Sequence, residues 1–236
     1  MPLLAALSFA MTLAGSTNAT LVASWSGDAT YADSVGGLNG RPMGGVTFVS
    51  GPPGITKKAF NFDGENSVVF IKDDPRFRFT KGFTISCWVN PLTDARYGSS
   101  PQGPLVFRGD DRSGLDPFVL ALTSDGHWGF HIEDGNHNGG DLSAPAQINC
   151  WTHLCATWDG ASGTMCLYVN GQLAATTKTA VHPLEMLDIN EHPGVSIGNV
   201  QNPFGDHHFQ PFNGSIAAVK IYNGAVAKPD YTPLKG

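Results

Sequence analysis

Residues 151–171 constrain the fold of this 236-residue chain more than any other stretch. Two runs rich in aromatic and β-branched residues, 151–158 and 164–169, flank a short turn rich in Gly, Ser and Asp, and Asn170-Gly171 follows the second run. Such runs, bounded by turn residues, predict a β-hairpin, and Asn-Gly is the strongest short-range signal for another tight turn. The segment therefore predicts a strand, a turn, a second strand and a second turn.

The rest of the chain repeats this pattern of short strands and turns. Charged residues make up only 14% of the chain, which contains 29 Gly and 16 Pro and has no long segment of helical period. Short strands at regular spacing predict a β-sandwich or jelly roll, and sandwiches of roughly 200–250 residues commonly fold as one unit. The formal net charge is -6 and the 14 Lys and Arg residues are scattered, which argues against nucleic acid as a partner.

The segment 83–91 shows the alternation expected of a sandwich strand. Phe83, Ile85 and Cys87 fall on one face, and Trp88 falls on the other. The other expected strands are 21–25, 46–49, 59–64, 67–71, 105–108, 118–122, 128–133, 172–177, 195–198 and 212–222.

The hairpin also resembles a known family. Its sequence resembles the run W-x-H-x-x-x-x-[WY]-D-G-x-x-G-x-x-x-L-Y-V-N-G that laminin-G-like and pentraxin-like domains carry. Three further blocks, which resemble G-V-T-F, A-F-x-F-D-G and F-T-I-S-x-W-V, come before the hairpin, and one that resembles F-N-G-x-I-D-E-V-x-I-Y comes after it. All of them stand in the family's order, so the resemblance covers residues 21–226. It implies an all-β, concanavalin A-like jelly-roll β-sandwich of two antiparallel sheets.

The N-terminus predicts export. Residues 2–14 are apolar but too short to span a bilayer, and small residues with a possible cleavage site at 17–19 follow. We interpret 1–19 as a secretory signal peptide and 20–236 as a single laminin-G-like jelly-roll domain. The alternative is an extended apolar first strand, because the segment lacks a Lys or Arg near its start.

Four cysteines in a secreted chain suggest disulfides. If Ala156 lies opposite Cys166 in the hairpin, Cys150 is roughly 20 Å from Cys166, and Cys155 and Cys166 face opposite ways. We therefore favour a bridge between Cys87 and Cys155, both expected to face inward. The resemblance implies the same pair, since pentraxins carry a bridge at these positions. The alternative is two buried thiols in contact, and Cys150 and Cys166 stay unassigned.

No familiar catalytic motif is present. The E-x-D-x-x-E signature of related glycoside hydrolases and the G-x-S-x-G motif are both absent. The nearest substitute places His131 and Glu133 on one face of a strand, with Asp141 expected nearby, and we interpret this row as a solvated outer face. His153 is interpreted as a packed, hydrogen-bonded core residue, and adjacent His207 and His208 would point in opposite directions, which is poor for zinc.

The resemblance to pentraxins implies a calcium site at one loop edge. Carried over to this chain, the candidate ligands are Asp116, Gln201 and Asn202, and the tentative ligand-binding loop edge is completed by Asp206 and His207. The chain departs from the pentraxin pattern at Pro117, Val200 and Asn202, and the missing carboxylates imply lower affinity for calcium. Asp33 and Asp63, each beside glycines, are either ligands of a structural ion or turn-forming residues.

These features predict a secreted, non-catalytic recognition module that binds carbohydrate or another extracellular or cell-surface ligand through its loops, with calcium as a possible cofactor. A sugar site needs an exposed aromatic platform, for which Trp128, Phe204 and His207 are candidates. The alternatives are a polysaccharide hydrolase or lyase with an unrecognised carboxylate site, and a protein-interaction domain without a small ligand. The expected partner is a glycan or an extracellular protein, with no membrane span.

Overall fold

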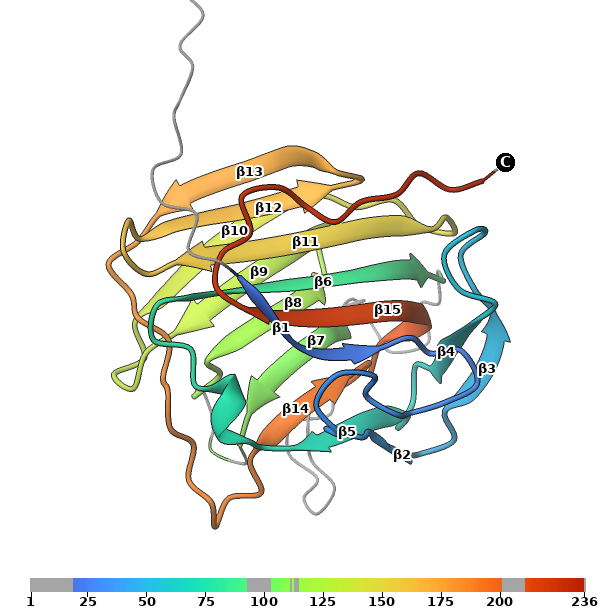
Figure 1. The fold of residues 1–236 in the computed structure, drawn as a ribbon, viewed down its shortest axis with the longest axis horizontal. Coiled ribbons are helices and arrows are strands. Elements are labelled where there is room, and N and C mark those ends of the chain that lie inside the picture. The colour runs from blue at the N-terminus through green and yellow to red at the C-terminus, as the bar shows by residue number, and fades with distance from the viewer. Residues whose placement is uncertain (1–18, 93–102, 111, 113–114, 201–210, 236) are drawn as a thin grey trace, which may run out of the picture.

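Two antiparallel sheets stack face to face in the computed structural model, which describes residues 19–92, 103–110, 112, 115–200 and 211–235 (Figure 1). Sheet A lies in front in Figure 1. Its strand order is β13 (Gln172–Lys178), β12 (Thr164–Val169), β11 (Thr152–Asp159), β6 (Gly82–Pro91), β15 (Asn213–Asn223), β4 (Lys58–Asp63) and β3 (Thr47–Ser50), and β1 (Thr20–Trp25) also pairs with β15.

Sheet B lies behind sheet A and is also antiparallel. Its strand order is β10 (Gly139–Pro145), β9 (His127–Glu133), β8 (Phe118–Leu122), β7 (Gly103–Gly109), β14 (Gly194–Ile197), β5 (Val68–Lys72) and β2 (Arg41–Met43). A single turn of 3-10 helix, η1 (Pro75–Phe77), follows β5. The expected jelly-roll sandwich of two antiparallel sheets is confirmed.

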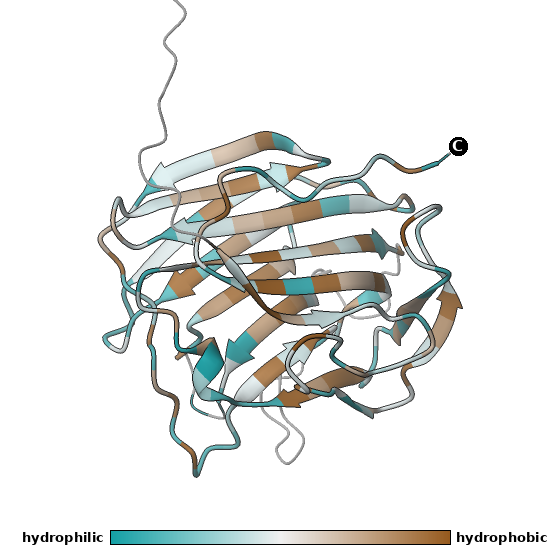
Figure 2. Cartoon of the chain, viewed as in Figure 1, coloured by the Kyte–Doolittle hydropathy of each residue, from teal (hydrophilic) through white to brown (hydrophobic). Residues whose placement is uncertain are grey.

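The core lies between the sheets and consists of alternate residues from both. In β9 the inward positions are Trp128, Phe130 and Ile132, which are at most 1% exposed, while the positions between them reach solvent. The bands of brown and teal along the strands in Figure 2 follow this alternation. The buried side chains that face the interior from both sheets form one continuous hydrophobic cluster, as expected of two sheets that pack face to face.

The predicted hairpin is confirmed, but its register differs from the expected one by one residue. Thr157, rather than Ala156, pairs with Cys166, because the turn is tighter by one position. Since side chains alternate along a strand, a shift of one residue moves a side chain to the other face. Cys155 and Cys166 therefore share the outer face of sheet A, where they pack with Tyr168.

The predicted Cys87–Cys155 bridge is wrong for this structure, in which all four cysteines are free thiols. Leu154, not Cys155, pairs with Cys87 across β11 and β6. Cys87 faces the core as predicted, but Cys155 faces outward, so their side chains lie on opposite sides of the sheet. A disulfide needs Cβ atoms that point toward each other, which this register prevents.

A C-terminal segment, residues 224–235, runs across the outer face of sheet A (red in Figure 1). At its start, the Thr84 hydroxyl donates to the carbonyl of Gly224 at 2.8 Å and accepts from the Val226 N–H at 3.0 Å. At its far end, the Lys235 N–H donates to the carbonyl of Pro53. The segment is thus tied to the sheet at both ends.

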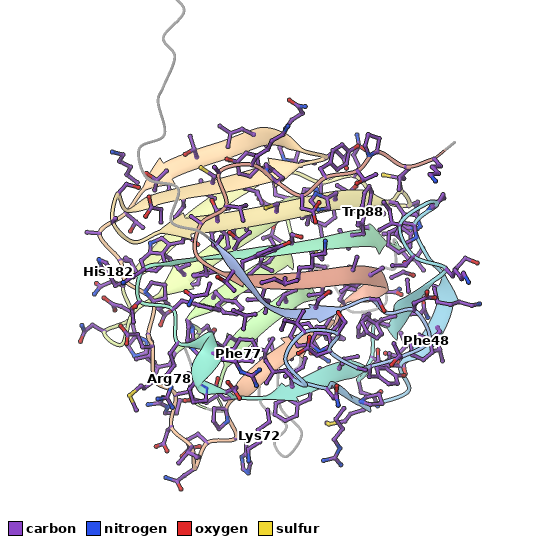
Figure 3. All side chains as sticks on the ribbon, viewed as in Figure 1. Phe48, Lys72, Phe77, Arg78, Trp88 and His182 are labelled. Carbon is purple, nitrogen blue, oxygen red and sulfur yellow. The ribbon has the colours of Figure 1, made fainter. Side chains whose placement is uncertain are left out.

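Between these ends, Tyr231 packs on two aromatic side chains of sheet A. Its ring stacks on Trp88 at 5.9 Å between centroids, and its centroid lies 5.6 Å from that of His153. Trp88, labelled in Figure 3, is only 4% exposed although it faces away from the core, as the sequence predicted. The C-terminal segment therefore buries the outer face that these residues occupy.

Candidate functional site

One row of side chains crosses the outer face of sheet B from strand to strand. In register, Asp141 pairs with His131, His131 with Val119, Val119 with Phe107, and Phe107 with Ser196. Paired residues share a face, so all five side chains point away from the core. Phe107 and Ser196 are buried, whereas the row opens to solvent toward β9 and β10.

The open part of this row forms a shallow depression of about 460 Å³. Small residues, Ala121 and Gly129, leave room at its base, since a strand residue without a long side chain exposes the sheet surface. Its lining is Gly103, Val119, Ala121, Leu122, Thr123, Gly129, Phe130, His131, Asp141, Leu142 and Ser143. A volume of this size is within the range of small-molecule sites.

His131 lies at one end of the depression between two carboxylates. Its Nδ1 is 2.8 Å from Oδ1 of Asp141, and its Nε2 is 3.3 Å from Oε2 of Glu133. The other oxygen of Glu133 lies 3.1 Å from Nδ1 of His137. The prediction that His131, Glu133 and Asp141 lie together is confirmed, and we call these three residues and His137 the His131 cluster.

The strand geometry explains why the ring of His131 holds this position. Gly139 pairs with Glu133 at the start of β10, and a Cβ atom at Gly139 would lie 2.7 Å from Cε1 of His131. Because glycine has no Cβ, the ring can approach the edge strand this closely. Glu133 has only 12% of its side chain exposed, whereas Asp141 has 79% exposed. The cluster therefore has one fixed and one accessible carboxylate.

Asp116 stands near the cluster, just before β8. Burial, together with the negative charge of Glu133, raises the pKa of Asp116 to about 6. The carboxyl groups of Asp116 and Glu133 are thus close enough for the charge of one to affect the pKa of the other. Gln201 and Asn202, with which Asp116 was predicted to bind calcium, lie outside the described residues, as do Asp206, His207, His208 and Phe204.

Within the part of the chain that the structure describes, no group of three or more His, Cys, Asp or Glu side chains is arranged to hold a metal ion. The calcium site therefore stays a prediction that depends on Gln201 and Asn202. Asp33 instead accepts four backbone hydrogen bonds, from Ser24, Val35, Gly36 and Leu38. Although burial acts to raise the pKa of Asp33, these bonds hold it below its usual value, as for a turn-forming residue.

Two other predicted roles need correction. Trp128 faces the core and is fully buried, so it cannot serve as an aromatic platform for a sugar. His153 is packed as predicted, but on the outer face of sheet A, and its Nδ1 has no hydrogen-bond partner among the described residues. Burial lowers the pKa of His153 to about 4.

The loop 179–193 borders the His131 cluster, a feature that the sequence did not predict. The Leu184 N–H donates to the carbonyl of Glu133 at 2.9 Å. Arg108, only 1% exposed, donates to the carbonyls of Leu184 and Glu185 and forms an ion pair with Asp73. This buried arginine holds the loop against β7, and the Leu184 N–H joins the same loop to the end of β9 at Glu133.

The cluster offers hydrogen bonds and negative charge to a ligand. A neutral imidazole has one N–H donor, so neutral His131 can donate to only one of its two carboxylate neighbours. A glycosidase, by contrast, needs two carboxylates that flank the scissile bond, one of them protonated. Glu133 and Asp141 both lie within hydrogen-bond distance of the same imidazole ring, that of His131.

Comparisons with known proteins agree with the fold. A family model of laminin-G type, described as the concanavalin A-like lectin/glucanases superfamily, matches residues 63–230. Human pentraxin-related protein PTX3 is 46% identical over 46 residues, 20% of this chain and 12% of the relative. Its bovine counterpart is 30% identical over 111 residues, 44% of this chain and 28% of the relative. These alignments span less than a third of each relative.

Solved structures show the same architecture at low sequence identity. Domain 4 of AbnA, an extracellular arabinanase of Geobacillus stearothermophilus solved with arabinotriose, has a TM-score of 0.62 and 22% identity over 89% of this chain and 95% of that one. The binding domain of botulinum neurotoxin DC in complex with SialylT has a TM-score of 0.61 and 16% identity over 88% and 48% of the two chains. In the described residues, no helix is long and apolar enough to cross a membrane.

Proposed function

Because the chain belongs to the laminin-G-like family of the concanavalin A-like lectin/glucanase superfamily, we propose that it is a secreted, non-catalytic module that binds carbohydrate on the outer face of sheet B. The observation that carries the proposal is the open depression with the His131 cluster at one end. The fold alone does not determine function, since folds of this kind support many activities.

The chemistry of the depression fits a sugar. Sugar hydroxyls donate and accept hydrogen bonds, and the lining supplies both kinds of partner in the Ser143 hydroxyl and the Asp141 carboxylate. The side chains of Val119 and Ala121 provide an apolar base on which the C–H face of a sugar ring can pack. Two structural neighbours were solved with arabinotriose and with SialylT, which supports a carbohydrate as the ligand class.

Export is part of the proposal and rests on the apolar N-terminal residues, which lie outside the described part of the chain up to residue 18. We expect the mature protein to begin near Thr20. N-terminal sequencing of the exported product would check this, and an intact Met1 on the exported protein would contradict it.

Glycan binding is tested by screening the mature protein against a glycan array and measuring each hit by calorimetry. We expect His131→Ala to weaken binding about tenfold or more, because it removes the partner of both carboxylates. The matched control is His127→Ala, a histidine on the same strand that is outside the lining of the depression. Equal affinities of both variants and the wild type would contradict a site at this place.

The non-catalytic part has its own test. The same glycans are incubated with the protein and their reducing ends are assayed. We expect no turnover above that of the Glu133→Gln variant. Turnover that depends on Glu133 would contradict the proposal and support the hydrolase alternative.

A further inference from the structure

The C-terminal segment, residues 224–235, has one aromatic anchor on the outer face of sheet A. Tyr231 packs against Trp88, His153 and Gly171, and we call these three residues the Tyr231 seat. Gly171 lies in the turn between β12 and β13, and a Cβ atom there would lie only 2.6 Å from the Tyr231 ring. Because glycine has no Cβ, the ring of Tyr231 lies directly against the backbone of this turn and closes the seat.

His153 is buried in the seat without a hydrogen-bond partner for one of its ring nitrogens. The residue is 2% exposed, and its Nδ1 has no partner among the described residues. The backbone of His153 is fixed, because its N–H donates to Oδ1 of Asn170 at 2.9 Å and its carbonyl accepts from the Asn170 N–H at 2.8 Å. An imidazolium carries N–H donors on both ring nitrogens, so a protonated His153 would have a buried donor without an acceptor while the seat is closed.

The charged groups near His153 form an ion pair between the segment and the sheet. Asp230 of the segment accepts a hydrogen bond from Nζ of Lys220 in β15, and this bond holds the pKa of Asp230 below its usual value. The pair therefore stays charged between pH 7 and pH 5. Burial lowers the pKa of His153 to about 4, while Asp230 acts to raise it and Lys220 to lower it. The ring also packs against Trp88, which does not ionise, and the phenol of Tyr231.

The segment can lift without disturbing the sheets. None of residues 224–235, all of which the structure describes, belongs to a strand. Gly224, at its start, has a φ of 123°, which makes it a suitable hinge. Lifting breaks the ring contacts of Tyr231, the ion pair of Asp230 and the terminal hydrogen bond of Lys235, whereas the strand pairing of sheet A is kept.

We propose that the C-terminal segment is an acid-released latch: protonation of His153 lifts Tyr231 from its seat and exposes the outer face of sheet A while the sandwich stays folded. In the open form, water supplies the acceptors that the imidazolium needs, and the pKa of His153 returns toward its ordinary 6.5. Acid therefore shifts the population toward the open form, by about twentyfold between pH 7 and pH 5. The latch is independent of the proposed glycan site, which lies on sheet B.

The test is hydrogen exchange of the mature protein, followed by NMR at pH 7 and pH 5. The Lys235 N–H reports opening, because its bond to the carbonyl of Pro53 breaks when the segment lifts, and amides of β6 and β15 in the middle of sheet A are the reference. Each observed rate is compared with the intrinsic rate at the same pH. We expect the protection of Lys235 to fall about twentyfold at pH 5, while the reference amides keep theirs. An equal fall at all of these amides would overturn the latch, since the whole sheet would then open.

A pair of variants identifies the proton that releases the segment. His153→Phe keeps an aromatic ring beneath Tyr231 but cannot bind a proton, so we expect the protection of Lys235 to change less than about twofold between the two pH values. His182→Phe is the matched control, since it makes the same substitution at an exposed histidine that lies far from Trp88 in Figure 3. It should keep the full fall in protection. A full fall in the His153→Phe protein would overturn the proposal.

Tyr231→Ala gives a second test, which does not need a substitution of His153. Without the anchor, we expect little protection of Lys235 at either pH, and an NMR titration should show the pKa of His153 raised from about 4 toward 6.5. A pKa that stays near 4 in this folded variant would overturn the latch. So would greater protection of Lys235 at pH 5 in the wild type, because it would mean that the imidazolium pairs with Asp230 and holds the segment closed.

Discussion

The two outer faces of the sandwich differ in what covers them. On sheet A, Trp88 and His153 lie under Tyr231 of the C-terminal segment, and both are less than 5% exposed. On sheet B, the side chains of His131 and Asp141 are 30% and 79% exposed. Both faces carry a histidine on a strand, so the difference lies in the covering. The covered face contributes to stability, and the open face is available for a ligand.

The largest effect expected from this comparison is on stability. Trp88→Ala removes a large buried side chain and its stacking on Tyr231, so we expect the free energy of unfolding to fall by about 3–5 kcal/mol. His131→Ala, on the open face, should change it by no more than about 0.5 kcal/mol. Denaturant unfolding measures both, and similar losses for the two variants would break the comparison.

The second effect is on the pH dependence of stability, because burial lowers the pKa of His153 to about 4 from its ordinary 6.5. The unfolded chain takes up the proton first as the pH falls. The contribution of His153 to the free energy of unfolding is therefore fully present above pH 6.5. It is lost progressively as the pH falls toward 4, and the loss is about 3 kcal/mol in all.

His153→Phe keeps an aromatic ring beneath Tyr231 but cannot bind a proton. We expect the difference in unfolding free energy between this variant and the wild type to shift by about that amount between pH 7 and pH 4. A constant difference over this range would show that His153 is not held neutral by burial. His127→Ala, at a partly exposed histidine on the other sheet, is the matched control.

A third effect should appear in binding alone. Gly139→Ala places a Cβ atom 2.7 Å from the ring of His131, so the ring must move and its contact with Asp141 is disturbed. We expect glycan affinity to fall about five- to tenfold, or about 1 kcal/mol, with a smaller change in stability. Gly126→Ala is a control at a glycine with open space around it, although its positive φ adds strain. Unchanged affinity for Gly139→Ala would contradict the role of His131.

The smallest effect concerns calcium. The predicted site has lost carboxylates relative to pentraxins, so we expect weak binding, and a threefold excess over the dissociation constant would add about 0.8 kcal/mol. This corresponds to a rise of about 2–3 °C in the unfolding midpoint, which Asp116→Ala should abolish. An identical midpoint in calcium and in chelator would rule out the site formed with Gln201 and Asn202.

Much of the fold could be predicted because its signals are local. Alternation along 83–91 correctly placed Cys87 inward and Trp88 outward. The same alternation along β9 places Trp128 on the inner face with Phe130. The prediction that Trp128 forms a sugar platform conflicts with this alternation. The predicted register of the hairpin was wrong for a different reason. A turn that is shorter by one residue moves side chains of one strand to the other face relative to their partners, and no pattern within the strands indicates the length of the turn.

The candidate site was predicted only in part. The contact of His131 with Asp141 follows from the pairing of two neighbouring strands, so sequence proximity was enough to suggest it. The contribution of His137 was missed because it depends on a left-handed backbone conformation, φ 61°, in the turn between those strands. The C-terminal segment was missed because Thr84 and Gly224 are 140 residues apart, and such a contact leaves no local pattern.

The observed register of the hairpin also gives this protein an internal reporter of movements of its C-terminal segment. It places the thiols of Cys155 and Cys166 together beneath Val226, where burial raises the pKa of Cys155 to about 12 and so keeps it unreactive. A thiol reagent reaches these two buried sulfur atoms more readily when the segment around Val226 is lifted from the sheet. The rate at which the two cysteines are labelled therefore reports how often the start of the C-terminal segment opens in the unmodified chain.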